Sequence, residues 1–129
     1  MRGSKADLPV AGAFDTPSGK VISRQAEWGA MNVALETAPA GLDTTPLFTG
    51  LPDDLCQCPH WGYVISGRVR VQYKDREEIL NAGDAYYLAP GHAVIVEEDA
   101  EMVEFSPQGE YQKTMAVAER NFAALQHGT

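Results

Sequence analysis

Short alternations of apolar and polar residues dominate the first 106 positions of the chain. Between positions 27 and 36, Met31, Val33 and Leu35 alternate with smaller or polar residues, as in a half-buried strand. Further segments rich in β-forming residues lie at 63–73, 77–80, 85–88, 93–97 and 102–106. Short strands at such regular spacing predict an antiparallel sandwich or barrel.

Glycine, proline and acidic residues mark the breaks between these segments. Gly67 lies inside the segment 63–73, which predicts a strand pair or one bent strand with a bulge or tight turn at that glycine. The segments 81–84 and 89–91 have the composition of turns. We interpret the acidic residues between 97 and 101 as a solvated hairpin tip between two strands: Glu97, Glu98, Asp99 and Glu101.

Two stretches outside the regular strands have a different character. Residues 1–25 carry Pro9, Gly12, Pro17 and Gly19, which indicates an N-terminal arm with one or two short strands. Residues 37–54 form a long Pro- and Gly-containing loop, typical of a lid or binding loop, or else of an arm packed on a partner. Its Leu47 and Phe48 are available to close over something apolar.

The last part of the chain changes period. Apolar residues recur there at steps of three and four, which predicts one face of an amphipathic helix: Tyr111, Met115, Ala118, Phe122 and Leu125. The expected organisation is therefore an arm at 1–25, a β-barrel at 26–106 and a C-terminal α-helix with a tail at 107–129.

Composition excludes several classes of function. The 129 residues include 10 Lys and Arg against 18 Asp and Glu, a formal net charge of -8, and no basic cluster offers a surface for nucleic acid. No stretch approaches the roughly 18 apolar residues of a membrane span. Two cysteines, only two positions apart, do not form a disulfide framework, so we expect free thiols and a cytoplasmic protein.

Candidate chemistry concentrates in the stretch Cys56-Gln57-Cys58-Pro59-His60. On an extended strand, alternate side chains share a face, so Cys56, Cys58 and His60 are expected to point the same way. Two thiols and an imidazole suit Zn²⁺ or another borderline transition metal, and His92 is placed to add a ligand from a neighbouring strand. The alternatives are buried thiols that only pack in the core, or a reactive thiol beside an imidazolium.

The same residues resemble the two sequence motifs of the cupins. The first cupin motif reads His-x-His, three or four residues, Glu, six residues and Gly; here Cys56, His60 and Gly67 keep that later spacing. The second reads Gly, five residues, Pro-x-Gly, two residues and His. The stretch from Gly83 to Gly91 follows it, with alanine in place of the first proline and with His92 two positions before the usual ligand.

The resemblance implies a mainly β fold, a cupin-type antiparallel barrel (jelly roll) ending in one α-helix. It also implies one divalent transition metal per chain, a small molecule in the barrel and a homodimer. Cupins hold Fe, Mn, Ni or Zn with His and Glu ligands, whereas the thiols of this chain favour Zn²⁺. The expected ligands are Cys56, His60 and His92, with Cys58 as a further one.

The candidate pocket residues are four aromatic residues and one glutamate: Trp28, Trp61, Tyr63, Tyr86 and Glu104. For each aromatic residue, ordinary barrel packing is the more common role. Glu104 alternates with apolar neighbours and so faces either the cavity or water; the solvent-exposed position is the expected one because glutamate is rarely buried unpaired. No catalytic residue is identified from the sequence alone.

Three functions follow from this pattern. The first is a metal-binding cupin that acts as a Lewis-acid isomerase, cyclase or lyase on a small organic molecule. The second is a non-catalytic binding or sensor protein in which the metal is structural, which would require a closed set of four ligands. The third is a redox sensor built on Cys56 and Cys58, which would require accessible, metal-free thiols.

Overall fold

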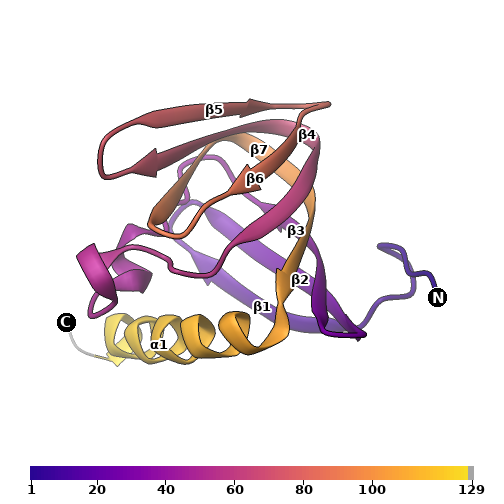
Figure 1. The fold of residues 1–129 in the computed structure, drawn as a ribbon, viewed down its shortest axis with the longest axis horizontal. Helices are drawn as coiled ribbons and strands as arrows, with labels where there is room; N and C mark the ends of the chain where they lie inside the picture. The colour runs from indigo at the N-terminus through magenta and orange to yellow at the C-terminus, as the bar shows by residue number, and fades with distance from the viewer. Residues whose placement is uncertain (128–129) are drawn as a thin grey trace.

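The regular structure consists of seven strands followed by one long helix, as Figure 1 shows. The structure is a computed structural model and describes residues 1–127. The strands are β1 (Val10–Thr16), β2 (Gly19–Trp28), β3 (Met31–Ala38), β4 (His60–Tyr73), β5 (Glu77–Asn81), β6 (Ala85–Leu88) and β7 (His92–Pro107). The helix α1 spans Gln108–His127, and two short 3-10 helices, η1 (Thr45–Phe48) and η2 (Pro52–Asp54), lie between β3 and β4. The predicted mainly β fold with a C-terminal helix is confirmed.

All strand pairs are antiparallel and belong to one sheet. Its order is β1-β2-β3-β7-β4-β5, and β6 pairs with the first part of β4. The sheet curls so that β1 to β3 and β4 to β6 face each other across an interior, while α1 runs along one side (Figure 1). Val64, Val69, Val71 and Val96 are almost completely buried within this barrel-like sheet, and Val69 and Val71 occupy alternating positions on β4.

The bend predicted at Gly67 is present within the single strand β4. The pairing of β4 with β7 shifts register three times between Val64 and Val69, and Gly67 has φ +88°. An added Cβ at this glycine would clash with the backbone of Asp99 and Ala100 on β7. Only a residue without a side chain allows both the left-handed backbone and this close approach.

The predicted break between 97 and 102 is wrong, because β7 continues through it as one strand of 16 residues. The bulges of β4 let the two strands pair on both sides of the irregularity. The acidic side chains there have partners on the outside of the sheet: Glu97 accepts from Arg68 at 2.9 Å and pairs with Arg70 at 2.9 Å. Arginines on the neighbouring strand thus offset the charge that made this segment resemble a solvated turn.

The predicted helix is confirmed, although its apolar stripe is shorter than expected. Ala118 is buried, and the ring of Phe122 lies 4.8 Å, centroid to centroid, from that of Phe14 on β1. Leu125 is 54% exposed, so the packed face ends at Phe122. Periodicity alone extended the stripe by one turn beyond the part of α1 that contacts the sheet.

The long segment between β3 and β4 folds over the start of β4. Phe48 on η1, together with the partly buried Leu47, Leu51 and Leu55, packs against Cys56 and Cys58 in a second apolar cluster. Asn121 of α1 ties this segment down by donating hydrogen bonds to the carbonyls of Leu47 and Thr49. Leu47 and Phe48 therefore close over an apolar cluster of the same chain, the one that contains the two cysteines.

The N-terminal region is paired into the sheet. Strand β2 crosses the predicted boundary between residues 25 and 26 and pairs with β3 from Ile22 to Trp28. Before β1, Leu8 is buried, and its carbonyl accepts a hydrogen bond from Arg24. The division of the chain at residues 25 and 106 remains a prediction.

Candidate metal centre

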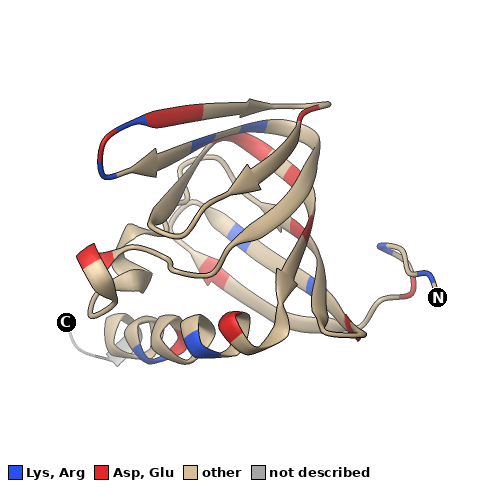
Figure 2. Cartoon of the chain, in the orientation of Figure 1, with Lys and Arg blue, Asp and Glu red and all other residues tan. Residues whose placement is uncertain are grey.

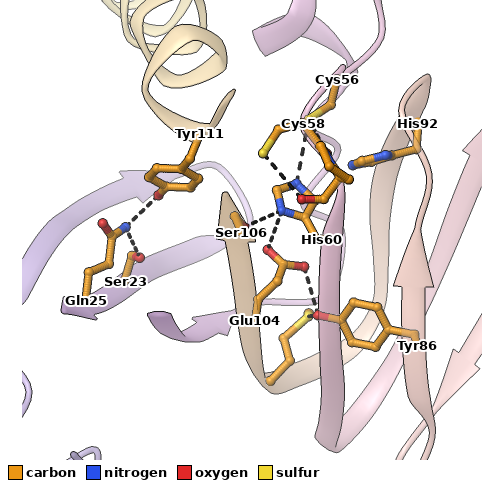
Figure 3. A network of polar contacts seen from close by, with 12 residues as sticks. Ser23, Gln25, Cys56, Cys58, His60, Tyr86, His92, Glu104, Ser106 and Tyr111 are labelled. Atoms are coloured by element: carbon orange, nitrogen blue, oxygen red, sulfur yellow. Dashed lines mark hydrogen bonds and ion pairs between the residues drawn. The ribbon is translucent and has the colours of Figure 1, made fainter. Parts of the chain in front are cut away.

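Three potential metal ligands converge where the chain enters β4 and β7. His60 is the first residue of β4 and His92 the first of β7, while Cys56 precedes β4 and forms an isolated bridge with His92. The bridge consists of two backbone hydrogen bonds, of 2.8 and 3.2 Å, between Cys56 and His92. It holds the thiol beside both imidazoles, as Figure 3 shows.

The ligand atoms of Cys56, His60 and His92 all lie within 4.8 Å of one another. The Sγ of Cys56 is 3.7 Å from Nε2 of His60, and the two imidazole rings are 5.1 Å apart. Two ligands of a tetrahedral zinc ion, with bonds of about 2.0–2.3 Å, are separated by roughly 3.5 Å. The three side chains therefore fit one such ion with only small movements.

Hydrogen bonds on the far side of each imidazole orient the rings. The carbonyl of Ala89 accepts a hydrogen bond of 2.7 Å from Nδ1 of His92, so in the neutral ring the lone pair is on Nε2. Nδ1 of His60 is 2.6 Å from the hydroxyl of Ser106 on β7, which leaves its Nε2 turned toward Cys56. Such outer contacts are typical of histidines that ligate metals.

Burial sets the protonation of the three side chains. It lowers the pKa of His60 and of His92 to about 4, so both rings are neutral at pH 7, as metal ligands must be. It raises the pKa of Cys56 to about 12, so without a cation the thiol keeps its proton. The ion itself would have to displace that proton on binding.

Cys58 lies close by but outside the group of three. It is fully buried, and its thiol faces the carbonyl of Pro59 at 3.4 Å. Residues 57–59 are not part of a strand, so the expected alternation of Cys56, Cys58 and His60 on one strand face is wrong. Burial raises the pKa of Cys58 to about 11, so this thiol also keeps its proton. The redox-sensor hypothesis requires accessible thiolates, and two buried, protonated thiols do not meet that requirement.

A second group of polar side chains adjoins the histidines. The hydroxyl of Tyr86 on β6 donates a 2.8 Å hydrogen bond to Glu104 on β7, whose other oxygen is 3.7 Å from Nδ1 of His60. Only 14% of the Glu104 side chain is exposed, so the expectation of a solvent-exposed glutamate is wrong. The Tyr86 hydroxyl and the adjacent histidine provide the partners that this enclosed carboxyl requires.

Glu36 on β3 also points into this region. The pKa of Glu36 is raised to about 7, chiefly because the carboxyl is desolvated and secondly because the negative charge of Glu104 lies nearby. Desolvation likewise raises the pKa of Glu104 to about 7, against the hydrogen bond from Tyr86. The pKa of Tyr86 is raised, chiefly by desolvation, so this phenol keeps its proton.

The predicted pocket aromatics separate into two groups. Tyr86 lies inside, beside Glu104, and Trp28 is half-buried at the end of β2. Trp61 and Tyr63 are each 45% exposed and alternate along β4 with the buried His60 and Val64. They therefore face away from His60, and the ring of Trp61 packs on that of Tyr87, at 5.1 Å between centroids. Their place in a substrate pocket stays a prediction.

Sequence reasoning did not identify Ser106, Glu36 or Tyr111 as parts of this region. Ser106 follows Glu104 by two positions on one strand, so the period of a strand places both on the same face. Glu36 follows the same rule relative to Asn32 and Ala34 on β3. The two-residue period of a strand shows in the sequence which of these residues share a face. Which of the two faces is the inner one depends on tertiary structure.

Within residues 1–127, no helix is long and apolar enough to cross a membrane. Basic residues are scattered over several elements of the ribbon and alternate with acidic ones (Figure 2). The chain as a whole has a formal net charge of -8.

Comparison with known proteins identifies the fold. The model of the cupin domain family matches residues 57–106, which include His60, His92, Glu104 and Ser106. A search of curated protein sequences finds no match.

Solved structures are similar in fold at low sequence identity. The polyketide cyclase RemF from Streptomyces resistomycificus has a TM-score of 0.59 and 16% identity, covering 84% of this chain and 79% of that chain. An RmlC-like cupin from Shewanella frigidimarina has a TM-score of 0.55 and 12% identity, covering 81% and 88%. KdgF from Halomonas sp. has a TM-score of 0.52 and 20% identity, covering 74% and 87%. The resemblance predicted from the two motifs is therefore confirmed: the chain has the cupin fold, and residues 57–106 are recognised as a cupin domain.

Proposed function

We propose that this protein is a metal-binding cupin that holds a small organic molecule in its barrel. Cys56, His60 and His92 hold one divalent transition metal in this proposal. The observation that carries it is the convergence of the three ligand atoms within 4.8 Å, with Nδ1 of both imidazoles already engaged elsewhere. That arrangement leaves the Nε2 lone pair of His92 for a cation and turns the Nε2 of His60 toward Cys56.

Zn²⁺ is the ion that this donor set favours. One thiolate and two imidazoles are borderline-soft ligands, whereas sites for iron or manganese in the same fold family are richer in imidazole and carboxylate. Fe, Ni and Mn are the alternatives that the resemblance implies. With three protein ligands, a tetrahedral ion keeps one position open for water or substrate.

The proposed reaction is an isomerisation, cyclisation or elimination of a small carbonyl, carboxylate or enol compound. A bound zinc ion supplies Lewis-acid polarisation of an oxygen atom. Glu104 lies 3.7 Å from His60 and holds or moves a proton at its carboxyl oxygens, while the Tyr86 hydroxyl orients that carboxyl from the other side. The likeness to a polyketide cyclase supports small-molecule chemistry of this kind.

A second candidate is a non-catalytic binding or sensor protein with a structural ion. Cys56 and His92 are each only 2% exposed, and Phe48 with its neighbours covers the thiol side of the group. Such a closed environment favours a structural ion, particularly where Cys58 moves in to complete a tetrahedron.

Elemental analysis of the purified protein, with three single variants, tests the proposal. About one metal ion per chain is expected in the wild type and in Cys58→Ala, and loss of metal is expected in Cys56→Ala and His92→Ala. Loss in all three variants would favour the structural site with four ligands. Metal-free protein after expression in metal-supplemented medium would refute the metal site.

We further propose that the protein is a cytoplasmic homodimer. Free thiols agree with a reducing compartment. The outer face of β4 and β6 exposes a group of large apolar side chains suited to a second copy: Trp61, Tyr63, Ile65 and Tyr87. Sedimentation of the wild type beside Trp61→Lys tests this, because a dimer through this face should dissociate in the variant.

A further inference from the structure

The turn before β7 orients the candidate ligand His92. Residues 89–91 connect β6 to β7, and the carbonyl of Ala89 accepts the 2.7 Å hydrogen bond from Nδ1 of His92. Pro90 follows Ala89 directly, which disfavours helical backbone at Ala89 and supplies no amide hydrogen to the turn. The direction of the Ala89 carbonyl, and with it the rotation of the imidazole, therefore depends on the contacts that hold Ala89 in place.

Two different elements hold the two ends of this turn. At the far end, the carbonyl of Cys56 accepts hydrogen bonds from the amides of Gly91 and His92, at 2.7 and 3.2 Å. At the near end, the amide of Ala89 donates a 3.1 Å hydrogen bond to the side-chain hydroxyl of Tyr73, the last residue of β4. The Tyr73 hydroxyl is therefore linked to the imidazole of His92 through a single residue.

Tyr73 is itself firmly placed. It is the cross-strand partner of His92 in the pairing of β4 with β7, and the two rings meet at 69° with 6.3 Å between their centroids. The guanidinium carbon of Arg76 lies 4.0 Å from the centroid of the Tyr73 ring, and the Tyr73 amide donates a 2.8 Å hydrogen bond to the carbonyl of Arg76. The ring also packs against the main apolar cluster of the barrel. These contacts fix the ring that carries the hydroxyl.

The two candidate imidazole ligands have different supports. Nδ1 of His60 lies 2.6 Å from the hydroxyl of Ser106 on β7, whereas Nδ1 of His92 donates to Ala89, which Tyr73 holds from β4. A change at Tyr73 should therefore disturb one imidazole and leave the other as it is. That selectivity distinguishes the orientation of a ligand from a general loosening of the fold.

We propose that Tyr73 is a positioning residue for the metal ligand His92. Its hydroxyl fixes Ala89, the Ala89 carbonyl fixes the Nδ1–H tautomer and the rotation of the ring, and Nε2 of His92 is thereby kept ready for the ion. The inference rests on the proposed function, since it concerns how strongly the same site holds its ion. Tyr73 contributes to that strength without being one of the candidate ligands.

The first measurement is the affinity for Co²⁺, by competition with a chromophoric chelator. Tyr73→Phe removes the hydroxyl but keeps the ring beside His92, and its affinity is expected to fall about tenfold. This is the lower end of the loss seen for outer partners of a ligand, because Ala89 lies between the hydroxyl and the imidazole. Tyr63→Phe removes the same atom from a 45% exposed tyrosine of the same strand and should keep the wild-type affinity.

The second measurement follows the imidazoles in the metal-free protein by nitrogen-15 NMR. The chain has only three histidines, so the ring signals can be assigned by substitution. In Tyr73→Phe, the Nδ1–H proton of His92 should exchange faster with water, and the signals of His60 should stay unchanged. Ser106→Ala should have the reverse effect, altering His60 and sparing His92.

The outcomes separate this inference from the metal site itself. If the wild type binds cobalt and Tyr73→Phe binds it equally well, the inference is overturned and the metal site stands. Equal changes at both imidazoles in Tyr73→Phe also overturn it, since they indicate a general loosening of the fold. If the wild type binds no cobalt, the metal site is refuted and the inference falls with it. Circular dichroism of each variant confirms that the compared proteins are folded.

Discussion

Nδ1 of His60 lies 2.6 Å from the hydroxyl of Ser106, and this contact joins the first residue of β4 to the last part of β7. It fixes the rotation of the imidazole, so that the opposite nitrogen faces Cys56 at 3.7 Å. A residue outside the group of three thus determines where one of the candidate ligands points.

Ser106→Ala should weaken metal binding while leaving all three candidate ligands in place. Loss of an outer hydrogen bond to a ligating histidine typically reduces metal affinity by about 10–100-fold. Competition with a chromophoric chelator measures the change. Ser66→Ala, at an exposed position of β4, is the matched control and should keep the wild-type affinity; an unchanged affinity in Ser106→Ala would show that the hydroxyl does not orient a ligand.

Both thiols should react slowly with a disulfide reagent in the native protein, even after chelation. Cys56 and Cys58 are 2% and 0% exposed, and burial raises the pKa of each thiol, which removes the nucleophilic thiolate. Titration in denaturant should then reveal two thiols per chain. Rapid reaction of the chelated native protein would instead restore the redox-sensor hypothesis.

The covering side chain Phe48 should control this protection. Phe48→Ala opens the cluster above the two cysteines and is expected to raise their rate of reaction at least about tenfold through local opening. Leu125→Ala removes an exposed side chain of α1 and should leave the rate unchanged. Equal rates in the two variants would mean that Phe48 does not shield the thiols.

Gly67→Ala should be among the most destabilising glycine substitutions in the barrel. The residue would have to adopt φ +88° and would also clash with the backbone of Asp99, so a loss on the order of 3 kcal/mol is expected. Gly83→Ala provides the control, since Gly83 has φ +93° but open space around it and should cost only about 1 kcal/mol. Urea unfolding of both variants measures the difference, and equal losses would assign the effect to backbone conformation alone.

Patterns within a few residues of sequence predicted the bend in β4, the C-terminal helix and the three candidate metal ligands. Gly67 marked the bend because a bulge needs its positive φ, and the period of Ala118 and Phe122 marked the helix. The spacing from Cys56 to His60, with His92 after the following turn, identified the three residues that the fold brings together. Each of these features leaves a signal within a few residues of sequence.

The remaining features depend on pairing between distant strands. Glu104 was expected in solvent because an unpaired buried carboxyl is costly, yet Tyr86 on another strand supplies its partner. Trp61 and Tyr63 were assigned to the pocket from residue type, although strand alternation turns them away from His60. Which face of a strand is the inner one is set by the closed sheet and has no local signature.

Glu36→Gln should make the protein more stable at neutral and alkaline pH but not at acid pH. The pKa of Glu36 is raised from its ordinary 4.5 to about 7 in the folded protein, so the folded state binds more protons than the unfolded state between these values. Wild-type stability therefore falls as the pH rises from about 4.5 to about 7, and the neutral glutamine removes this loss. At pH 8 the variant is expected to gain on the order of 1–3 kcal/mol in urea unfolding, and at pH 4.5 close to nothing. Glu27→Gln, which changes the same charge at an exposed position, should shift the curve little at either pH. A gain of equal size at both pH values would show that the amide stabilises the interior for a reason other than the charge of Glu36.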